Sequence, residues 1–202
     1  MDLDALLPEF DVSDEVAVTV AASPEQTFAA LMDVDLIELG RNRPLIGVLG
    51  ALRMLPDLLS HVLHGEPVAS PPERMRLLDT ADQPAAEGGW TLLANEPGAA
   101  IALGLVGRFW RPVIEYRDVP AGEFTAFDEP GWAKTIYALN VAPLPGDRTL
   151  LRGIMRTATT DEHARRWFRR YWTFGVGPGA HMLVEGLLDD ARSRAERVIV
   201  PA

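Results

Sequence analysis

The chain has 202 residues, of which 48% are hydrophobic and 24% are charged, and this composition is typical of one globular domain. It contains no cysteine, which excludes disulfides, cysteine-ligated zinc, iron–sulfur clusters and a thiol nucleophile. The formal net charge is −10, whereas a duplex-binding protein needs a cationic footprint, so we expect no nucleic acid among the partners.

The start of the chain differs from a secretory signal. Such a signal has a basic region followed by an apolar one, whereas these first residues are acidic and are interrupted by Pro8. We therefore expect a cytoplasmic protein. Residues 1–13 are interpreted as an N-terminal extension that packs late or not at all, and residues 14–200 as a single domain.

The most hydrophobic stretch is residues 44–63. Its length is near that of a membrane span, but Arg53, Pro56 and Asp57 lie inside it, and a spanning helix rarely tolerates central charges. We expect no stable membrane insertion. A buried or half-buried helix is the plain interpretation, and a helix on a membrane surface or a mobile lid over a pocket are the alternatives.

The first elements have clear local signals. Residues 14–22 alternate and are rich in valine, which predicts a strand. Ser23 and Gln26 have capping-box spacing around a proline, which predicts a helix over residues 24–32. Residues 33–43 are expected to form an irregular connection.

A proline-rich loop at residues 67–72 separates this part from a run of short segments between turn residues. Such closely spaced segments predict an antiparallel meander. The expected strands cover residues 74–80, 90–95, 99–106, 113–119, 132–142 and 148–159.

The last segment predicts a long helix that begins near Asp161, with several aromatic residues between positions 167 and 174. Aromatic residues at this spacing are usually core, and they are also suited to a cavity wall. Residues 175–179 interrupt the helix with three glycines, which we interpret as a kink rather than a phosphate-binding loop because no strand precedes them. The helix is expected to resume over residues 180–198.

This order of elements resembles the START-related superfamily, also called the polyketide cyclase/dehydrase and lipid-transport superfamily. The resemblance is carried by residues 16–28 (VAVTVAASPEQTF), 148–156 (RTLLRGIMR) and the helix 161–198, with lesser support from residues 104–110 and 169–172. It implies an α+β helix-grip fold, in which a curved antiparallel sheet wraps around a long C-terminal helix with two N-terminal helices. It also implies a small hydrophobic ligand of lipid, polyketide or terpenoid type between sheet and helix, and no cofactor.

Within such a fold, the side chains of one strand face and of the last helix are expected to line the cavity. Ile101, Leu103 and Leu105 form a bulky strand face, whereas the opposite face is small and allows close approach of another element or a second subunit, so a homodimer is left open. The expected ligand-binding residues are Leu103, Leu105, Tyr137, Leu139, Met155, Phe168, Tyr171, Trp172 and Val184.

The candidates for catalysis are few. His181 and Glu185 are four residues apart on the predicted helix, so they share a face and could form an acid–base pair. They could also ligate a metal, but no convincing third and fourth ligand is found, so no metal is expected; a structural role is the plain alternative. With Tyr137, they are the weak candidates for a cyclase, aromatase or dehydratase, which is the alternative to a non-catalytic binding module. A third alternative is an interaction protein whose cavity is filled by its own side chains.

The charged residues of the two longest strands are expected on the outer face of the sheet. Placing Tyr137 inward puts Lys134, the only lysine, outside. Arg152 and Arg156 share a strand face, and a solvated face with ion pairs is favoured over a clamp for a carboxylate. The arginines at positions 165–170 are expected on the exposed side of the last helix.

Overall fold

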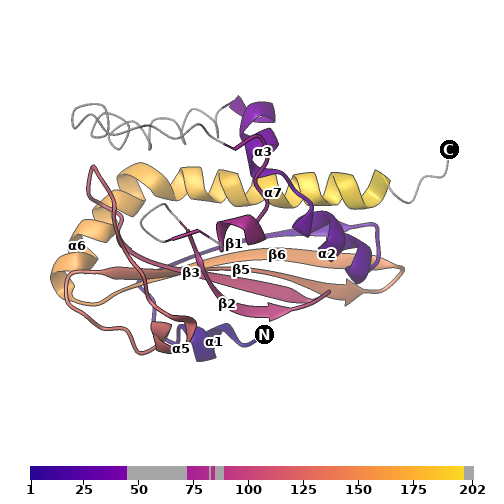
Figure 1. Cartoon of the computed structure of the whole chain (residues 1–202). Coiled ribbons are helices and arrows are strands. Elements are labelled where there is room, and N and C mark those ends of the chain that lie inside the picture. The colour runs from indigo at the N-terminus through magenta and orange to yellow at the C-terminus, as the bar shows by residue number, and fades with distance from the viewer. Residues whose placement is uncertain (45–71, 82, 85–88, 198–202) are drawn as a thin grey trace.

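The computed structural model describes residues 1–44, 72–81, 83–84 and 89–197. The expected apolar helix over residues 44–63 and most of the proline-rich loop lie outside the described residues. The chain forms an antiparallel sheet with a long helix across one face and two short helices under the other (Figure 1). This is the predicted α+β helix-grip architecture.

The sheet has six strands in the order β1-β6-β5-β3-β2, with β4 paired to β3, and all pairs are antiparallel. The meander β2 to β6 is therefore closed at one side by the N-terminal strand, which pairs with the last strand. The strands are β1 (Val12–Val20), β2 (Thr91–Glu96), β3 (Ala100–Arg108), β4 (Glu115–Arg117), β5 (Ala133–Leu144) and β6 (Arg148–Thr159).

The helices surround this sheet on both sides. The C-terminal segment runs as α6, a π-helical turn η3 and α7, and it crosses the face that α2 also covers (Figure 1). The helical elements are α1 (Leu3–Leu6), α2 (Pro24–Met32), α3 (Leu36–Asn42), η1 (Leu78–Thr80), α5 (Ala121–Phe124), α6 (Glu162–Tyr171), η3 (Trp172–Val176) and α7 (Gly177–Arg197).

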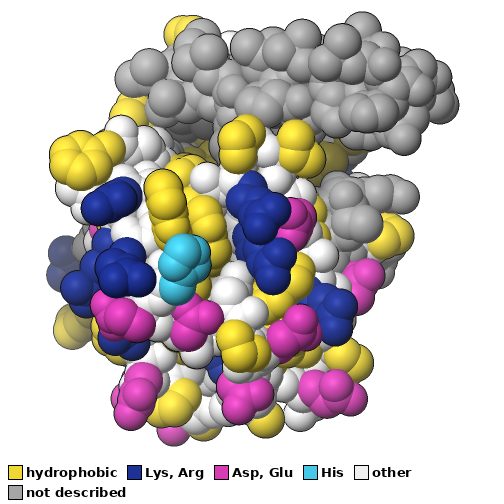
Figure 2. Space-filling view, turned by 90° about the vertical axis from the view of Figure 1, so that its left-hand side faces the viewer, with side chains coloured by type: hydrophobic (Ala, Val, Ile, Leu, Met, Phe, Trp, Pro, Cys, Tyr) yellow, Lys and Arg dark blue, Asp and Glu magenta, His cyan; other side chains and the backbone are white. Residues whose placement is uncertain are grey.

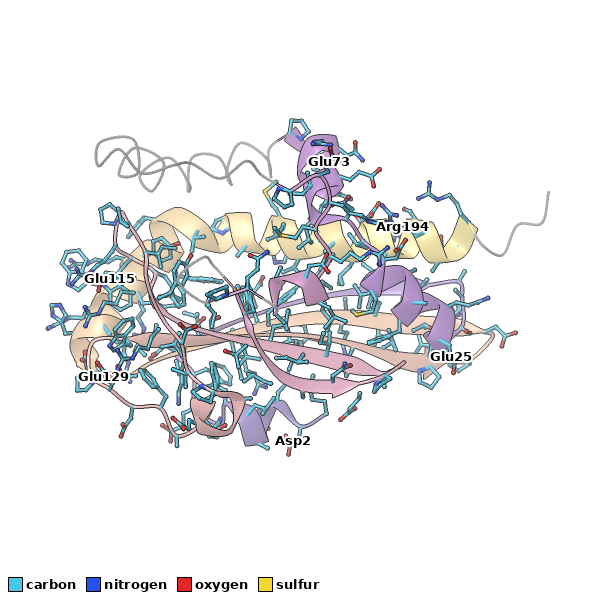
Figure 3. All side chains as sticks on the ribbon, viewed as in Figure 1. Asp2, Glu25, Glu73, Glu115, Glu129 and Arg194 are labelled. Carbon is cyan, nitrogen blue, oxygen red and sulfur yellow. The ribbon has the colours of Figure 1, made fainter. Side chains whose placement is uncertain are left out.

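Polar caps decide where the helices begin. The predicted α2 is confirmed, because Ser23 and Gln26 form a complete capping box. The expectation of an irregular connection at residues 33–43 is wrong, because the Asp35 side chain accepts hydrogen bonds from the amides of Ile37 and Glu38 and starts α3. Arg194 of α7 then donates to Glu38 at 2.9 Å and so holds α3 against α7 (Figure 3).

Two other expectations are corrected. Residues 74–80 form no strand; this segment ends in the short helix η1, where the Thr80 hydroxyl donates to the Leu77 carbonyl. The first residues are not an unpacked extension, because Leu7 is 1% exposed and packs with Phe124 beneath the sheet. Asp2 starts α1 on this lower side, opposite α7 (Figure 3).

Hydrophobic cores lie on both faces of the sheet. The helix-facing core joins Ile101 and Leu103 to Leu187 and Leu188 of α7. On the other face, the small side of β3 admits an element of the same chain: a Cβ atom added at Gly104 would lie 2.7 Å from the ring of Phe124. The close approach expected at this face is therefore made by α5.

Candidate functional site

A pocket of about 400 Å³ opens at the edge of the sheet, between β1, η3 and the start of α7. We call it the edge pocket. It combines the side chains of an acidic residue and a histidine with those of an aromatic residue and a proline. Its lining is Ser13, Asp14, Trp172, Thr173, Gly177, Pro178 and His181.

The charged part of the edge pocket is a pair formed by Asp14 and His181. The His181 Nδ1 atom lies 2.9 Å from Oδ2 and 3.0 Å from Oδ1 of Asp14. Asp14 is on the side of β1 that faces the helix. It occupies the position between Val12 and Val16 in the series of every second residue that forms this side. Because Nδ1 is engaged by the carboxylate, Nε2 is the ring nitrogen left to meet another molecule.

The apolar part is built by the π-helical turn. Trp172 starts this turn and stacks on Phe168 with ring centroids 6.1 Å apart. A Cβ atom at Gly177 would lie 2.7 Å from the Trp172 carbonyl oxygen and 3.0 Å from the indole ring, so only glycine fits there. Gly177 thus lets the indole lie at the pocket wall, and the helix continues through this segment as a π-helical turn rather than being interrupted.

Tyr137 lies on the same sheet face, two strands from the edge. Met155 pairs with Asp14 on one side and with Tyr137 on the other, so the three residues form one row across the sheet. The Tyr137 hydroxyl is buried beside Gly153, and it has no hydrogen-bond partner among the described residues. Burial raises the pKa of this hydroxyl well above its ordinary value, so it is a neutral donor at physiological pH.

The nine residues expected to bind a ligand all lie on the helix-facing side. Leu103, Tyr137, Leu139 and Val184 belong to the core under α7, and Leu105, Phe168, Tyr171 and Trp172 to a second cluster near η3. Met155 lies next to Tyr137 on the same face of the sheet, because the two residues are paired across β5 and β6. Their contact with a ligand stays a prediction.

The catalytic candidates are separated by the structure. His181 pairs with Asp14, whereas Glu185 is exposed and takes no part in the edge pocket. Asp14 was not foreseen from the sequence. The available signal was its position as the polar residue in the otherwise valine-rich face of β1, at Val12, Val16, Val18 and Val20.

The charged residues of β5 and β6 lie on the other face, as expected. The Lys134 Nζ atom donates to the carbonyl oxygens of Phe124 and Thr125, and burial lowers the pKa of this amine. Arg152 lies 3.7 Å from Glu15, and Arg156 pairs with Asp4 while its guanidinium covers the ring of Phe10. The predicted ion pairs are present, but the face is not solvated as expected, because α1, α5 and a second hydrophobic core cover it.

In the described part of the chain, no group of three histidine or acidic side chains could hold a metal ion. None of the described helices combines the length and hydropathy needed to cross a bilayer.

No family model and no curated protein matches the sequence. Among solved structures, protein MLL2253 from Mesorhizobium loti is 15% identical, with 94% of this chain and 100% of that chain covered and a TM-score of 0.41. The Zhui aromatase/cyclase from Streptomyces sp. R1128 is 13% identical, with 94% and 99% covered and a TM-score of 0.32. CalU16 from Micromonospora echinospora is 14% identical, with 92% and 84% covered and a TM-score of 0.29. Similarity this weak carries no function from these proteins to the chain.

Proposed function

We propose that the protein binds a small hydrophobic or amphipathic molecule, of lipid, polyketide or terpenoid type, on the helix-facing side of its sheet. The observation that carries this proposal is the edge pocket, where an aromatic wall meets the Asp14–His181 pair. The apolar body of a ligand would pack on Trp172 and Pro178. A polar group of the ligand would bond to the Nε2 atom of His181, which is the ring nitrogen that Asp14 does not engage.

The edge pocket is a depression open to solvent, with a volume of about 400 Å³, so it would cover one side of a small ligand rather than enclose it. Small-molecule sites are mostly apolar with a few polar groups that orient the ligand, and this pocket has that mixture. The resemblance of the sequence to the START-related superfamily points to the same class of ligand.

Tyr137 supports a ligand that reaches further under α7. A buried hydroxyl without a partner costs about 1–3 kcal/mol, and a carbonyl or hydroxyl of the ligand would recover this cost. The row Asp14–Met155–Tyr137 gives the direction in which the ligand would extend from the edge pocket. Met155, with its flexible thioether, can adapt to an apolar chain lying over it.

A proton-transfer enzyme of cyclase, aromatase or dehydratase type is the second candidate, and the Asp14–His181 pair favours it. A carboxylate that accepts from Nδ1 orients the imidazole, so that the other ring nitrogen is directed towards a bound substrate as a general base. In this reading the pocket positions the substrate, His181 is the base and Tyr137 is a hydrogen-bond donor. Glu185 has no role in it.

The test begins with native and denaturing mass spectra of freshly purified protein. Extra mass that disappears on denaturation would identify a retained ligand. For ligand-free protein, anilinonaphthalene sulfonate serves as an amphipathic probe. His181→Gln should weaken binding of this probe, whereas His163→Gln, at an exposed position of α6, should not. If the spectrum is clean and neither the wild type nor the variants bind the probe, the binding proposal fails.

Product formation separates the second candidate from the first. If the protein is an enzyme, the wild type should convert a retained polyketide or terpenoid, whereas His181→Gln should hold that molecule unconverted. If the protein is a pure binding module, the molecule released on denaturation should be chemically identical for the wild type and the variant.

A further inference from the structure

The end of the molecule formed by α6 and η3 exposes two large aromatic side chains. Phe174 is 88% exposed and Trp167 is 46% exposed, although both were expected to be core or cavity wall. The buried residues of this segment are instead Ala164 and Phe168. One exposed aromatic side chain needs no explanation, but two at the same end of the molecule provide apolar surface for a contact.

Two arginines that have no ionic partner in the described part of the chain lie beside these aromatic residues in sequence. Arg165 is paired with Asp11 and Glu162, whereas Arg166 and Arg170 are exposed and have no carboxylate within 4.0 Å among the described residues. The Arg170 guanidinium lies 5.6 Å from the centroid of the Trp167 ring. In a chain of net charge −10, unpaired cations at one end are a local reversal of charge.

These residues share one side of the helix. Arg166 and Arg170 are four residues apart, Trp167 lies between them, and Phe174 follows Arg170 by four. We call Arg166, Trp167, Arg170 and Phe174 the α6 patch. Figure 2, which views the molecule from the α6 end, shows basic and hydrophobic side chains next to one another on this surface.

We propose that the α6 patch docks the protein on an anionic phospholipid surface. Guanidinium groups bind phosphate through paired hydrogen bonds, and aromatic rings favour the boundary between headgroups and acyl chains. The acidic remainder of the molecule would be repelled by the same surface, so the charge distribution selects the orientation in which the patch faces the lipid. A protruding phenylalanine suits insertion between lipids better than docking on the polar surface of an acidic protein.

The docked orientation also concerns the edge pocket. Trp172 and Thr173 of η3 line that pocket, and Phe174 follows them directly in sequence. Docking through the α6 patch would therefore bring the rim of the pocket to the lipid surface. The docking proposal does not rest on ligand binding, because it is tested with lipid vesicles alone.

The test is co-sedimentation of the full chain with two kinds of vesicle. One kind is pure phosphatidylcholine, and the other is an equal mixture of phosphatidylcholine and phosphatidylglycerol. We expect sedimentation with the anionic vesicles only, and release at about 1 M salt, where the screening length is about 3 Å. Each arginine that is lost should lower the partition coefficient about fivefold.

Four variants separate the parts of the α6 patch. Arg166→Glu with Arg170→Glu should abolish binding, and Phe174→Gln should weaken it at every salt concentration. Arg148→Glu, at the β5–β6 turn at the opposite end of β6, and Leu78→Gln, another exposed apolar residue, are the matched controls and should bind like the wild type.

Two outcomes would overturn the proposal. If the wild type stays in solution with both vesicles, the patch does not bind lipid, and an acidic protein becomes the occupant to examine. If the control variants lose binding as much as the patch variants do, the attraction is not located at α6.

Discussion

At the scale of single residues, two buried hydroxyl groups of the sheet differ in their hydrogen bonding. The Thr149 hydroxyl donates to the carbonyl of Ala22 at 2.7 Å, and it thereby ties β6 to the chain after β1. The Tyr137 hydroxyl is buried without a partner in the described part of the chain. An unpaired buried hydroxyl costs free energy, so a ligand group that bonds to Tyr137 would recover this cost.

The two hydroxyls therefore predict opposite effects. Tyr137→Phe should leave the free energy of unfolding of the ligand-free protein unchanged or raise it by about 1 kcal/mol, because no hydrogen bond is lost. Thr149→Val should lower it by about 1–3 kcal/mol, because the Ala22 carbonyl loses its buried donor. Urea unfolding of both variants is the measurement. A large loss in Tyr137→Phe would mean that the hydroxyl is already bonded.

At the scale of elements, helix starts and helix-to-sheet contacts decide the geometry. The α3 helix exists because Asp35 caps it and also accepts a hydrogen bond from the Met75 amide. The α7 helix lies close to the sheet because Gly153 leaves room for Val184: a Cβ atom at Gly153 would lie 2.6 Å from the Val184 Cγ1 atom. Both contacts join segments that are distant in sequence.

The Asp35 cap predicts a pH-dependent contribution to stability. Burial by itself raises the pKa of Asp35. Hydrogen bonds from the amides of Met75, Ile37 and Glu38, together with the charge of Arg74, lower this pKa by more than burial raises it, so the net shift is downward. The contribution is therefore complete above the ordinary carboxyl pKa of about 3.9 and is lost as the pH falls through the lower folded value.

Accordingly, Asp35→Ala should cost about 1–2 kcal/mol at neutral pH, and the difference from the wild type should shrink at acidic pH. Thermal unfolding followed by circular dichroism at both pH values measures it. An equal cost at both values would show that the charge of Asp35 does not matter.

Close packing at Gly153 predicts a clash that a second change relieves. Gly153→Ala should destabilise the protein by about 1–3 kcal/mol, because the new methyl group overlaps the Val184 side chain. Adding Val184→Ala should restore part of the loss, so the two changes should not be additive. Denaturant unfolding of the single variants and the double variant gives the coupling energy between the two positions. If the two effects are additive, Gly153 and Val184 are not in close contact, and α7 lies further from β6 than described.

At the scale of the whole molecule, the sheet is buried on both faces. The lower face is covered by α1, α5 and the N-terminal residues, with Phe124, Trp132 and Ile136 in its core. The start of the chain is thus part of the folded structure, since Asp11 also accepts hydrogen bonds from the Thr159 amide and hydroxyl. Ligand binding is consequently proposed only for the helix-facing side.

Leu7 tests this architecture. Leu7→Ala should lower the free energy of unfolding by about 2–5 kcal/mol, the cost of a cavity in a well-packed core. Guanidinium unfolding measures it, with Leu3→Ala as the control, because Leu3 lies in α1, the helix directly before Leu7, and is only half-buried. An effect of Leu7→Ala as small as that of the control would mean that the N-terminal segment contributes little to stability.

The sequence by itself determined the elements with short-range signals. The capping box at Ser23, the Gly146–Asp147 turn with positive φ angles, and the alternation of β5 and β6 all act between residues that are close in the chain. The inward direction of Tyr137 and the outward direction of Lys134 followed from that alternation. Local stereochemistry and side-chain period are sufficient for features of this kind.

Tertiary structure decided the rest. Asp14 and His181 are 167 residues apart in the chain and meet because β1 pairs with β6 beneath α7. Trp167 and Phe174 are exposed because the helix turns Ala164 and Phe168, not these two residues, towards the sheet. Spacing along the chain carries no information on such pairings, because they depend on which surfaces the completed sheet and helices bring together.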